Sequence, residues 1–425
     1  MVLLTRLTRL AGRHGHINWA LADQVMVSGS NVLTGILLAR FLGVDGFGTY
    51  SLAWAVLLLV ASVHLPLIVG SMMSIGPKQS AEEAPGYYGA VIIQNLAVAV
   101  AGAVIVTVAA EVSGWLVPVW GVERLALPLG VATFAMVWQE FFRRYFFTRG
   151  RPAAAFTVDA VRYVSQIAIL LAFFVFAPGV IDAGLALWIV AGSAALPAAV
   201  SLKFVGAIEF RAGVIASITA RHYHASKWMV MSQPIEWASE YVFMFAAGTF
   251  LGTAAVGALR ASQNVAAMTS ILFLSLLNVV PARAARHLHE SGMAGMSDYL
   301  RRVTLTAGSA TVVVCLVLAL TPAFWLGLLF GGDYVQYGEL LRWWSLYYAI
   351  NFFTLPLRSG FRAMEKTRPV FTSWLAGAGF AIISVGFVIP LFGLRGAVIG
   401  ALLTKTIATA WLWYLYRKSL KETAD

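Results

Sequence analysis

Long apolar segments recur along almost the whole chain and leave little room for any other kind of structure. A helix needs about 20 mostly apolar residues to cross a lipid bilayer, and twelve segments meet this requirement. They are 18–42, 47–73, 87–110, 125–147, 153–176, 183–204, 226–250, 256–281, 299–321, 338–361, 369–391 and 396–416. Because backbone polar groups in lipid must be paired internally, and the runs are too long for barrel strands, these segments should be helices. We therefore predict an all-α polytopic membrane protein with twelve transmembrane helices.

The composition agrees with this prediction. Of the 425 residues, 60% are hydrophobic and 12% are charged, whereas soluble domains carry about 25% charged residues. The net charge of +11 could indicate nucleic-acid binding. The basic residues lie between the apolar segments rather than in a stripe on a soluble domain, so we expect no nucleic-acid partner.

Lysine and arginine residues indicate the orientation of the helices. With both termini in the cytoplasm, 23 of the 30 basic residues fall in inner loops or at inner helix ends, and only Arg124, Arg342 and Arg395 fall in outer loops. Cytoplasmic loops are the ones enriched in basic residues. The sequence therefore predicts cytoplasmic termini, with a basic leader that lies on the anionic membrane surface.

The chain contains an internal repeat. Phe41-Leu42-Gly43 with Gly48 recurs as Phe250-Leu251-Gly252 with Gly257, and three further Tyr, Pro and Gly matches follow in order, so that the four matches have offsets of 209–217 residues. Because each repeat has six helices, both halves have the same orientation in the membrane. We therefore predict two bundles that form a parallel repeat, related by a pseudo-two-fold axis along the membrane normal, with a central cleft between them. The expected regions are a basic leader (1–17), an N-terminal six-helix bundle (18–204), an amphipathic linker (205–225), a C-terminal six-helix bundle (226–417) and a tail (418–425).

The repeated segment Leu38–Tyr50 also carries a family resemblance. Its pattern Ala39-Arg40-Phe41-Leu42-Gly43-x4-Gly48-x-Tyr50 closely resembles the first loop of polysaccharide transport proteins, flippases of the multidrug/oligosaccharidyl-lipid/polysaccharide (MOP) superfamily. Arg368-Pro369 and the later Ile389-Pro390-x2-Gly393-x2-Gly396-Ala397 look like late-helix features of that family. The resemblance covers roughly 18–418. It implies transfer of an undecaprenyl-pyrophosphate-linked oligosaccharide from the inner to the outer leaflet of the bacterial inner membrane, and it supplies no fixed set of site residues.

Glu236 and Glu240 are the most informative charges inside the predicted helices. Their spacing of four places both carboxylates on one helix face, and Pro234 just before them can open the backbone. Ionisable groups in a membrane are candidates for function, so either carboxylate could bind a proton or a sodium ion. The alternative is that each pairs with a basic group on a neighbouring helix.

Basic and amide side chains are candidates for contact with the substrate. Arg40 and Arg260 flank the two copies of the repeated turn, and a guanidinium group suits a pyrophosphate; either could instead reach to the outer headgroups. Lys405 lies in the middle of its helix, where it could balance a glutamate or meet phosphate. Gln263 and Asn264 could line the cleft or serve helix packing.

Other polar groups favour structural roles. Asp159 and Arg162, three residues apart, are predicted to form an ion pair. Asp23 makes the first helix unusually polar, which suits either a cleft-lining helix or helix packing. Seven histidines and one cysteine form no metal-ligand spacing, so we expect no metal site and no cofactor.

We therefore expect a flippase that works by alternating access and not an enzyme. The chain has no P-loop, so an ion gradient would supply the energy, and proteins of polysaccharide assembly could associate with it. A cation-coupled multidrug exporter of the same superfamily is the alternative, and basic cleft residues argue against it. A membrane-embedded polymerase or ligase would need a sizeable outer loop with clustered catalytic residues, which the predicted loops are too short to supply.

Overall fold

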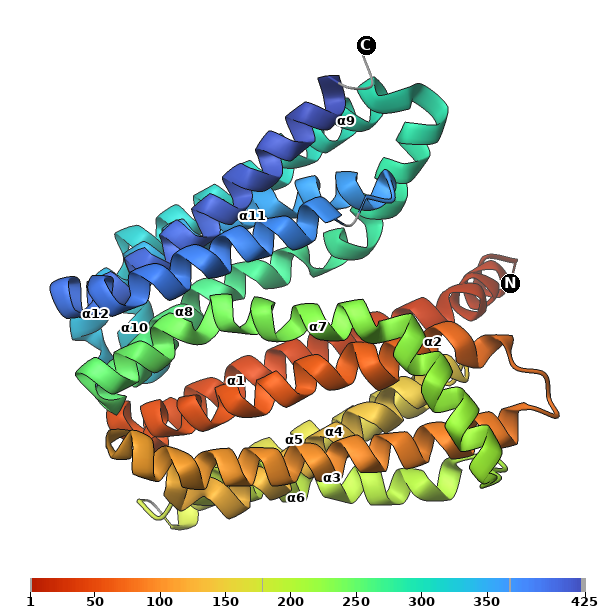
Figure 1. Ribbon diagram of the computed structural model, residues 1–425, viewed down its shortest axis with the longest axis horizontal. Helices are drawn as coiled ribbons and strands as arrows, with labels where there is room; N and C mark the ends of the chain where they lie inside the picture. Colours follow the sequence, from red (N-terminus) through yellow and green to blue (C-terminus); the bar gives the residue numbers. More distant parts are fainter. Residues whose placement is uncertain (1, 178, 367, 422–425) are drawn as a thin grey trace. The chain divides into compact units, whose positions relative to one another are not determined.

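The computed structural model describes residues 2–177, 179–366 and 368–421, and within these ranges it contains helices and no strand (Figure 1). The short π-helical turn Leu65–Gly70 (η1) and several 3-10 turns connect longer elements. The α-helices are α1 Val2–His64, α2 Ser71–Ile75, α3 Ala84–Leu116, α4 Ala126–Thr148, α5 Pro152–Phe176, α6 Ala183–Ser201, α7 Ala212–Leu251, α8 Thr253–Ala267, α9 Leu274–Leu320, α10 Pro322–Phe330, α11 Gly338–Ala363 and α12 Arg368–Lys421.

All twelve predicted segments are helical in the structure, apart from Thr321 at the end of the ninth. In the described residues, seven helices are long and apolar enough to cross a membrane. Two of them, Ala22–Lys78 and Arg368–Lys421, are 57 and 54 residues long, more than twice the roughly 20 residues that one crossing requires. These lengths are compatible with twelve crossings. The number of crossings and the cytoplasmic location of the termini remain predictions.

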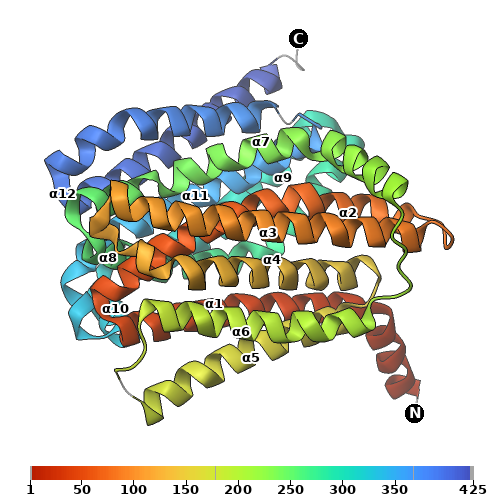
Figure 2. The ribbon, with the colours of Figure 1, turned by 60° about the horizontal axis from the view of Figure 1, so that its bottom comes forward.

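Glycine kinks divide the longest helices. Gly43 in α1 and Gly393 in α12 have φ values of 66° and 58° and ψ values far from helical. The two arms of α12 fold back on each other at its kink (Figures 1 and 2). A side chain is strained at such positive φ values, so glycine is the residue that permits each reversal.

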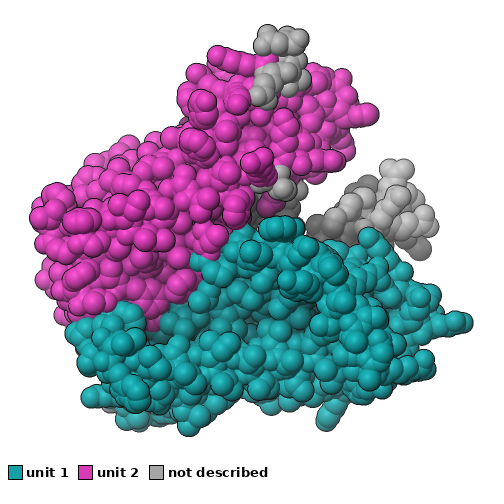
Figure 3. All heavy atoms as spheres, viewed as in Figure 1, with its two compact units in different colours: residues 1–42, 53–234 teal, residues 43–52, 235–425 magenta. Residues whose placement is uncertain are grey.

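The chain forms two compact units (Figure 3). The first contains residues 1–42 and 53–234, and the second contains residues 43–52 and 235–425. The predicted linker therefore lies in the first unit, together with the start of α7. The first copy of the repeated turn, which follows Leu42, lies in the second unit with the second copy.

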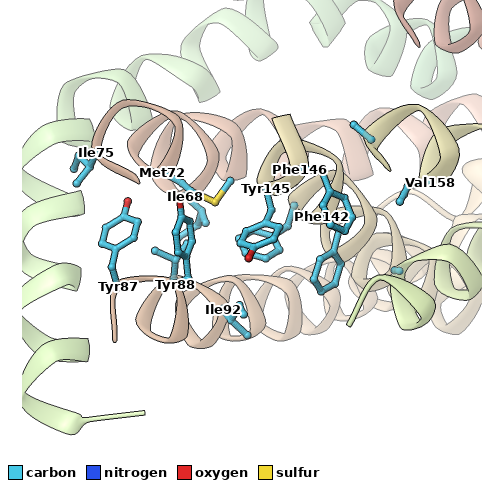
Figure 4. Packing of buried hydrophobic residues seen from close by; sticks show 14 residues of the cluster. Ile68, Met72, Ile75, Tyr87, Tyr88, Ile92, Phe142, Tyr145, Phe146 and Val158 are labelled. Atoms are coloured by element: carbon cyan, nitrogen blue, oxygen red, sulfur yellow. The ribbon is translucent and has the colours of Figure 1, made fainter. Parts of the chain in front are cut away.

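The core of the first unit is rich in aromatic rings. Tyr88 of α3 faces Ile68 and Met72, Tyr87 lies toward Ile75, and Tyr145 of α4 belongs to the same cluster (Figure 4). The rings of Tyr88 and Tyr145 meet edge to face with their centroids 5.1 Å apart. This geometry is favourable for aromatic pairs and holds α4 firmly against α3.

The predicted linker, residues 205–225, packs against α3 within the first unit. Predicted as an amphipathic helix, it is helical only from Ala212, where it begins α7. The backbone amide of Glu209 donates to the carbonyl of Pro85 at 3.0 Å. One turn apart, Thr219 accepts from the Gln94 amide at 2.9 Å, and His222 Nε2 lies 3.1 Å from the hydroxyl of Tyr87. The helix therefore contacts α3 through hydrogen bonds, and its Ile218 packs against the apolar core of the same unit.

In the second unit the two copies of the repeated turn contact each other. A Cβ atom on Gly48 would lie 1.8 Å from the carbonyl oxygen of Thr253, and one on Gly257 would lie 1.9 Å from that of Val44. Only glycine permits backbones to approach this closely. The Thr253 hydroxyl also donates to the carboxylate of Asp45. The repeat thus packs on itself through matched glycines.

Candidate functional site

Four helices of the second unit surround a small cavity of about 30 Å³. Its lining includes Glu240 of α7, Gln263 of α8, Arg358 of α11 and Lys405 of α12. A second cavity of about 20 Å³ shares Glu240 and Gln263 and adds Arg260. The sequence-predicted residues Arg260, Gln263, Glu240 and Lys405 therefore meet in one place.

Small residues allow the two arms of α12 to reach this cavity together. A Cβ atom on Gly377 would already lie 3.3 Å from the carbonyl oxygen of Thr404 and 3.4 Å from the Cβ of Ala408. Trp374 precedes this contact on one arm, and Lys405 lies beside it on the other. Close packing of the arms thus places an indole and an ammonium group on the same cavity wall.

The charges around the cavity are close to one another without being paired. Glu236, Glu240, Arg358 and Lys405 interact electrostatically. Yet within the described part of the chain no ion pair within 4.0 Å joins any of them. Glu240 is exposed, and the other three are half-buried. With Arg260, this cluster has three basic and two acidic groups, so its formal charge is +1.

Several hydrogen-bond donors at the cavity have no partner among the residues that the structure describes. The Nε1 atoms of Trp344 and Trp374 and the Nε atom of Arg358 are buried there without an acceptor. The Arg358 guanidinium lies 5.2 Å from the centre of the Trp374 ring, and the Lys405 ammonium lies 5.5 Å from that of Tyr347. A buried donor without an acceptor costs about 1–3 kcal/mol. The arrangement therefore favours a group that is rich in oxygen acceptors.

The remaining predicted contact residues differ in position. Arg260 donates to the side-chain oxygen of Gln263 at 2.9 Å, which fixes both groups on α8. Asn264, the next residue, is half-buried and lines neither cavity. Arg40 is exposed, belongs to the first unit and lines neither of the two cavities.

Arg358, Trp344 and Trp374 were not among the predicted site residues. Arg358 lies three residues before the end of the segment 338–361, where an arginine is expected to reach the cytoplasmic surface. The sequence does hold a signal, because Arg358 follows Trp344 by 14 residues, close to four helical turns of about 3.6 residues. That spacing places both side chains on one face of α11.

The first unit contains a second group of charges, and these are paired. Arg143 of α4 lies 2.6 Å from a carboxylate oxygen of Asp23 in α1 and 2.6 Å from one of Asp159 in α5. Glu140 accepts from Arg143 at 3.3 Å and from Arg144 at 2.6 Å. All three helices are thereby joined through one buried guanidinium group.

The ion pair predicted between Asp159 and Arg162 is replaced by a bridge. The amide of Gln139 donates to Asp159, and its oxygen accepts from Arg162. Asp159 forms its ion pair with Arg143 instead. The i, i+3 spacing allowed a direct contact, but a side chain from the neighbouring helix α4 lies between the two groups. Gln139, Glu140 and Arg143 were missed because the sequence does not show which helix packs beside α5.

Comparison with known proteins places this geometry in context. Residues 229–388 match the MatE family model, while no curated protein sequence matches the chain. The fold is similar to the lipid II flippase MurJ in an inward closed conformation, with a TM-score of 0.75, 12% identity and coverage of 95% of this chain and 87% of that one.

Two transporters of the MOP superfamily are similar as well. One is a multidrug resistance MATE family transporter in an inward-facing conformation, with a TM-score of 0.71, 15% identity and coverage of 95% and 96% of the two chains. The other is a MOP superfamily transporter from Pyrococcus furiosus, with a TM-score of 0.64, 14% identity and coverage of 96% of each chain. The chain thus has the helical fold of these transporters, and the MatE match lies within its second half.

Proposed function

We propose that the protein is a multi-pass transporter of the bacterial inner membrane. Its substrate would be an undecaprenyl-pyrophosphate-linked oligosaccharide, a precursor of O-antigen or exopolysaccharide, which it moves across the membrane by alternating access. The observation that carries the proposal is the unpaired cluster around the cavity of the second unit. There, Arg260, Arg358 and Lys405 lie with the indole groups of Trp344 and Trp374, and three buried N–H donors, two indole and one from Arg358, have no acceptor among the described residues.

A pyrophosphate fits the chemistry of this cluster. Guanidinium groups bind phosphate through two parallel hydrogen bonds, and the indole N–H groups of Trp344 and Trp374 add donors without adding charge. The cavity of about 30 Å³ holds no more than a single small group. In this conformation it would contact one phosphate oxygen, and fuller contact requires the helices to move.

Ion coupling would use the two glutamates. Glu236 and Glu240 share their electrostatic neighbours, Arg358 and Lys405, with the proposed phosphate. When no phosphate is bound, the positive charges of these two cations attract the carboxylates from beyond ion-pairing distance. When phosphate takes the cations, the carboxylates lose that stabilisation and favour a proton or a sodium ion. Substrate binding and ion binding would thus support each other.

A cation-coupled multidrug exporter is the second candidate. The observation in its favour is that Glu240 is exposed at the cavity, where a carboxylate could receive an organic cation. The similarity to a MATE transporter is compatible with it. The formal charge of +1 favours an anionic cargo over a cationic one, because like charges repel more strongly where water is scarce.

Transport by the purified full-length protein in liposomes tests the proposal. We expect the wild type to move a fluorescent pyrophosphate-linked oligosaccharide lipid between leaflets, and Arg358→Gln to slow this transfer about tenfold. The matched control is Arg362→Gln, which changes an exposed arginine one turn further along α11 and should alter the rate less than twofold.

Two results would count against the proposal. If the wild type moves organic cations and leaves the saccharide lipid in place, the exporter is the better description. If Arg358→Gln and Arg362→Gln slow transfer equally, the cavity is not where the substrate binds.

A further inference from the structure

A groove of about 270 Å³ lies on the second unit between α9, α11 and α12. None of its lining residues belongs to the cavities of the candidate site. Three large apolar side chains in it are exposed: Leu305 by 61%, Phe353 by 38% and Trp413 by 47%. Its volume is close to the roughly 300 Å³ at which small-ligand pockets begin, so it has room for one slender chain.

The neutral polar side chains in the groove hydrogen-bond to other groups of the protein. The hydroxyl groups of Ser297 and Tyr416 are hydrogen-bonded to each other at 3.0 Å. Thr304 donates to the carbonyl oxygen of Leu300, one turn back, at 2.8 Å. Only one O–H, from the Ser297–Tyr416 pair, is left without a hydrogen-bond acceptor among the described residues, and the rest of the wall is apolar, which suits hydrocarbon better than a sugar with its many hydroxyl groups.

Positive charge lies beside this apolar groove. Arg301 lines it, is exposed, and has no ion-pair or hydrogen-bond partner among the residues that the structure describes. The guanidinium of Arg417 lies 3.9 Å from the centre of the Trp413 ring, a wall of the groove. Both arginines are at helix ends predicted to face the cytoplasm, where anionic headgroups attract basic residues.

We propose that this groove binds an anionic phospholipid of the inner leaflet, with one acyl chain between α9 and α12 and the phosphate beside Arg301 and Arg417. Each methylene of the acyl chain that is buried on the apolar walls adds to the affinity through the hydrophobic effect. The guanidinium groups then select a phosphate that carries net negative charge over a zwitterionic headgroup. Occupancy would tie α9 to the second arm of α12, two elements that meet at this groove.

Lipid binding to the purified full-length protein tests this inference, and it does so without any transport measurement. Native mass spectrometry would count phosphatidylglycerol and phosphatidylcholine retained by the wild type. We expect phosphatidylglycerol to be preferred, and Arg301→Gln to weaken its retention about fivefold, the effect of one basic residue near a membrane surface.

Arg302→Gln is the matched control, because Arg302 is also exposed, adjoins Arg301 and does not line the groove. A second variant, Leu305→Trp, adds bulk from an exposed position and should reduce retention of both phospholipids. Equal effects of the two arginine substitutions would overturn the proposal. So would preferential displacement of phosphatidylglycerol by an equal amount of polyprenyl phosphate, which would assign the groove to a carrier lipid.

Discussion

Charged side chains inside the helices form ion pairs in the first unit, whereas those at the cavity of the second unit form none among the described residues. In the first unit, Arg143 is buried between Asp23 and Asp159, with oxygens 2.6 Å away on both sides. In the second, Arg358 and Lys405 have carboxylates nearby, yet in the described chain none lies within ion-pairing distance. Paired charges fix helices to one another, whereas unpaired charges at a cavity stay available to a ligand. Whether an intramembrane charge has a structural or a ligand-binding role can therefore be inferred only once its partner is known.

The largest expected effect comes from replacing Arg143, the residue at the centre of the paired network. Arg143→Ala should destabilise the protein by about 3–5 kcal/mol, because it leaves two buried carboxylates without a counter-charge. Thermal unfolding in detergent would measure the loss. Arg144→Ala is the control, since Arg144 pairs with Glu140 in a half-exposed position and such pairs are worth about 1 kcal/mol or less. Equal losses of stability in the two variants would show that the buried ion pairs of Arg143 contribute no more than the partly exposed pair of Arg144.

The next largest effect concerns a group of the first unit that stays neutral. Burial, reinforced by the positive charge of Arg221, lowers the pKa of His222 from 6.5 to about 4. The unfolded chain therefore takes up a proton below about pH 6.5, and the folded chain does so only near pH 4. Stability should be constant above pH 6.5 and fall by at most about 3 kcal/mol between these values.

Comparison of unfolding temperatures between pH 7 and pH 4.5 for wild type and His222→Gln checks this expectation. The glutamine variant cannot take up this proton, so its unfolding temperature should fall less over the range. Parallel curves for the two proteins would contradict the expectation and place the pH sensitivity elsewhere.

The smallest expected effect on stability is that of replacing Lys405 in the second unit. This variant tests directly whether the unpaired charges differ from the paired ones of the first unit. Lys405→Met removes a half-buried charge that has no ion-pair partner within the described residues. It should change the unfolding free energy by less than about 1 kcal/mol, because no pair is broken. Transport should still fall about tenfold. A large loss of stability would show that Lys405 holds the helices together as Arg143 does.

Much of the helical arrangement could be predicted because it depends on local sequence. Runs of apolar residues set where helices begin and end, and Gly43 and Gly393 mark reversals that a side chain would resist. The linker was predicted less well, because its helix begins only at Ala212. The residues before it are not helical, and one of them, Glu209, hydrogen-bonds to Pro85, a contact that the linker sequence alone does not predict.

The candidate site was predictable only in part. Glu240 and Lys405 stood out because charges are rare in the middle of apolar segments. Arg358 was assigned to the cytoplasmic end because it lies near the end of its segment, and the structure places it at the cavity. For Asp159, the nearest basic residue on its own helix was the natural partner, yet Arg143 and Gln139 of α4 take that role.

The sequence alone determined that this chain is a set of apolar helices, where they bend, and that a turn with matched glycines occurs twice. These properties follow from neighbouring residues, through the hydrogen bonding of the backbone and the preference of each side chain for lipid or water. Only the tertiary structure decided which helices pack together. That choice paired Arg143 with two carboxylates, brought Gly48 against Gly257, and left Arg358 and Lys405 at a cavity. The reason is physical: the rotation of each helix about its axis is set by packing against residues far away in the chain.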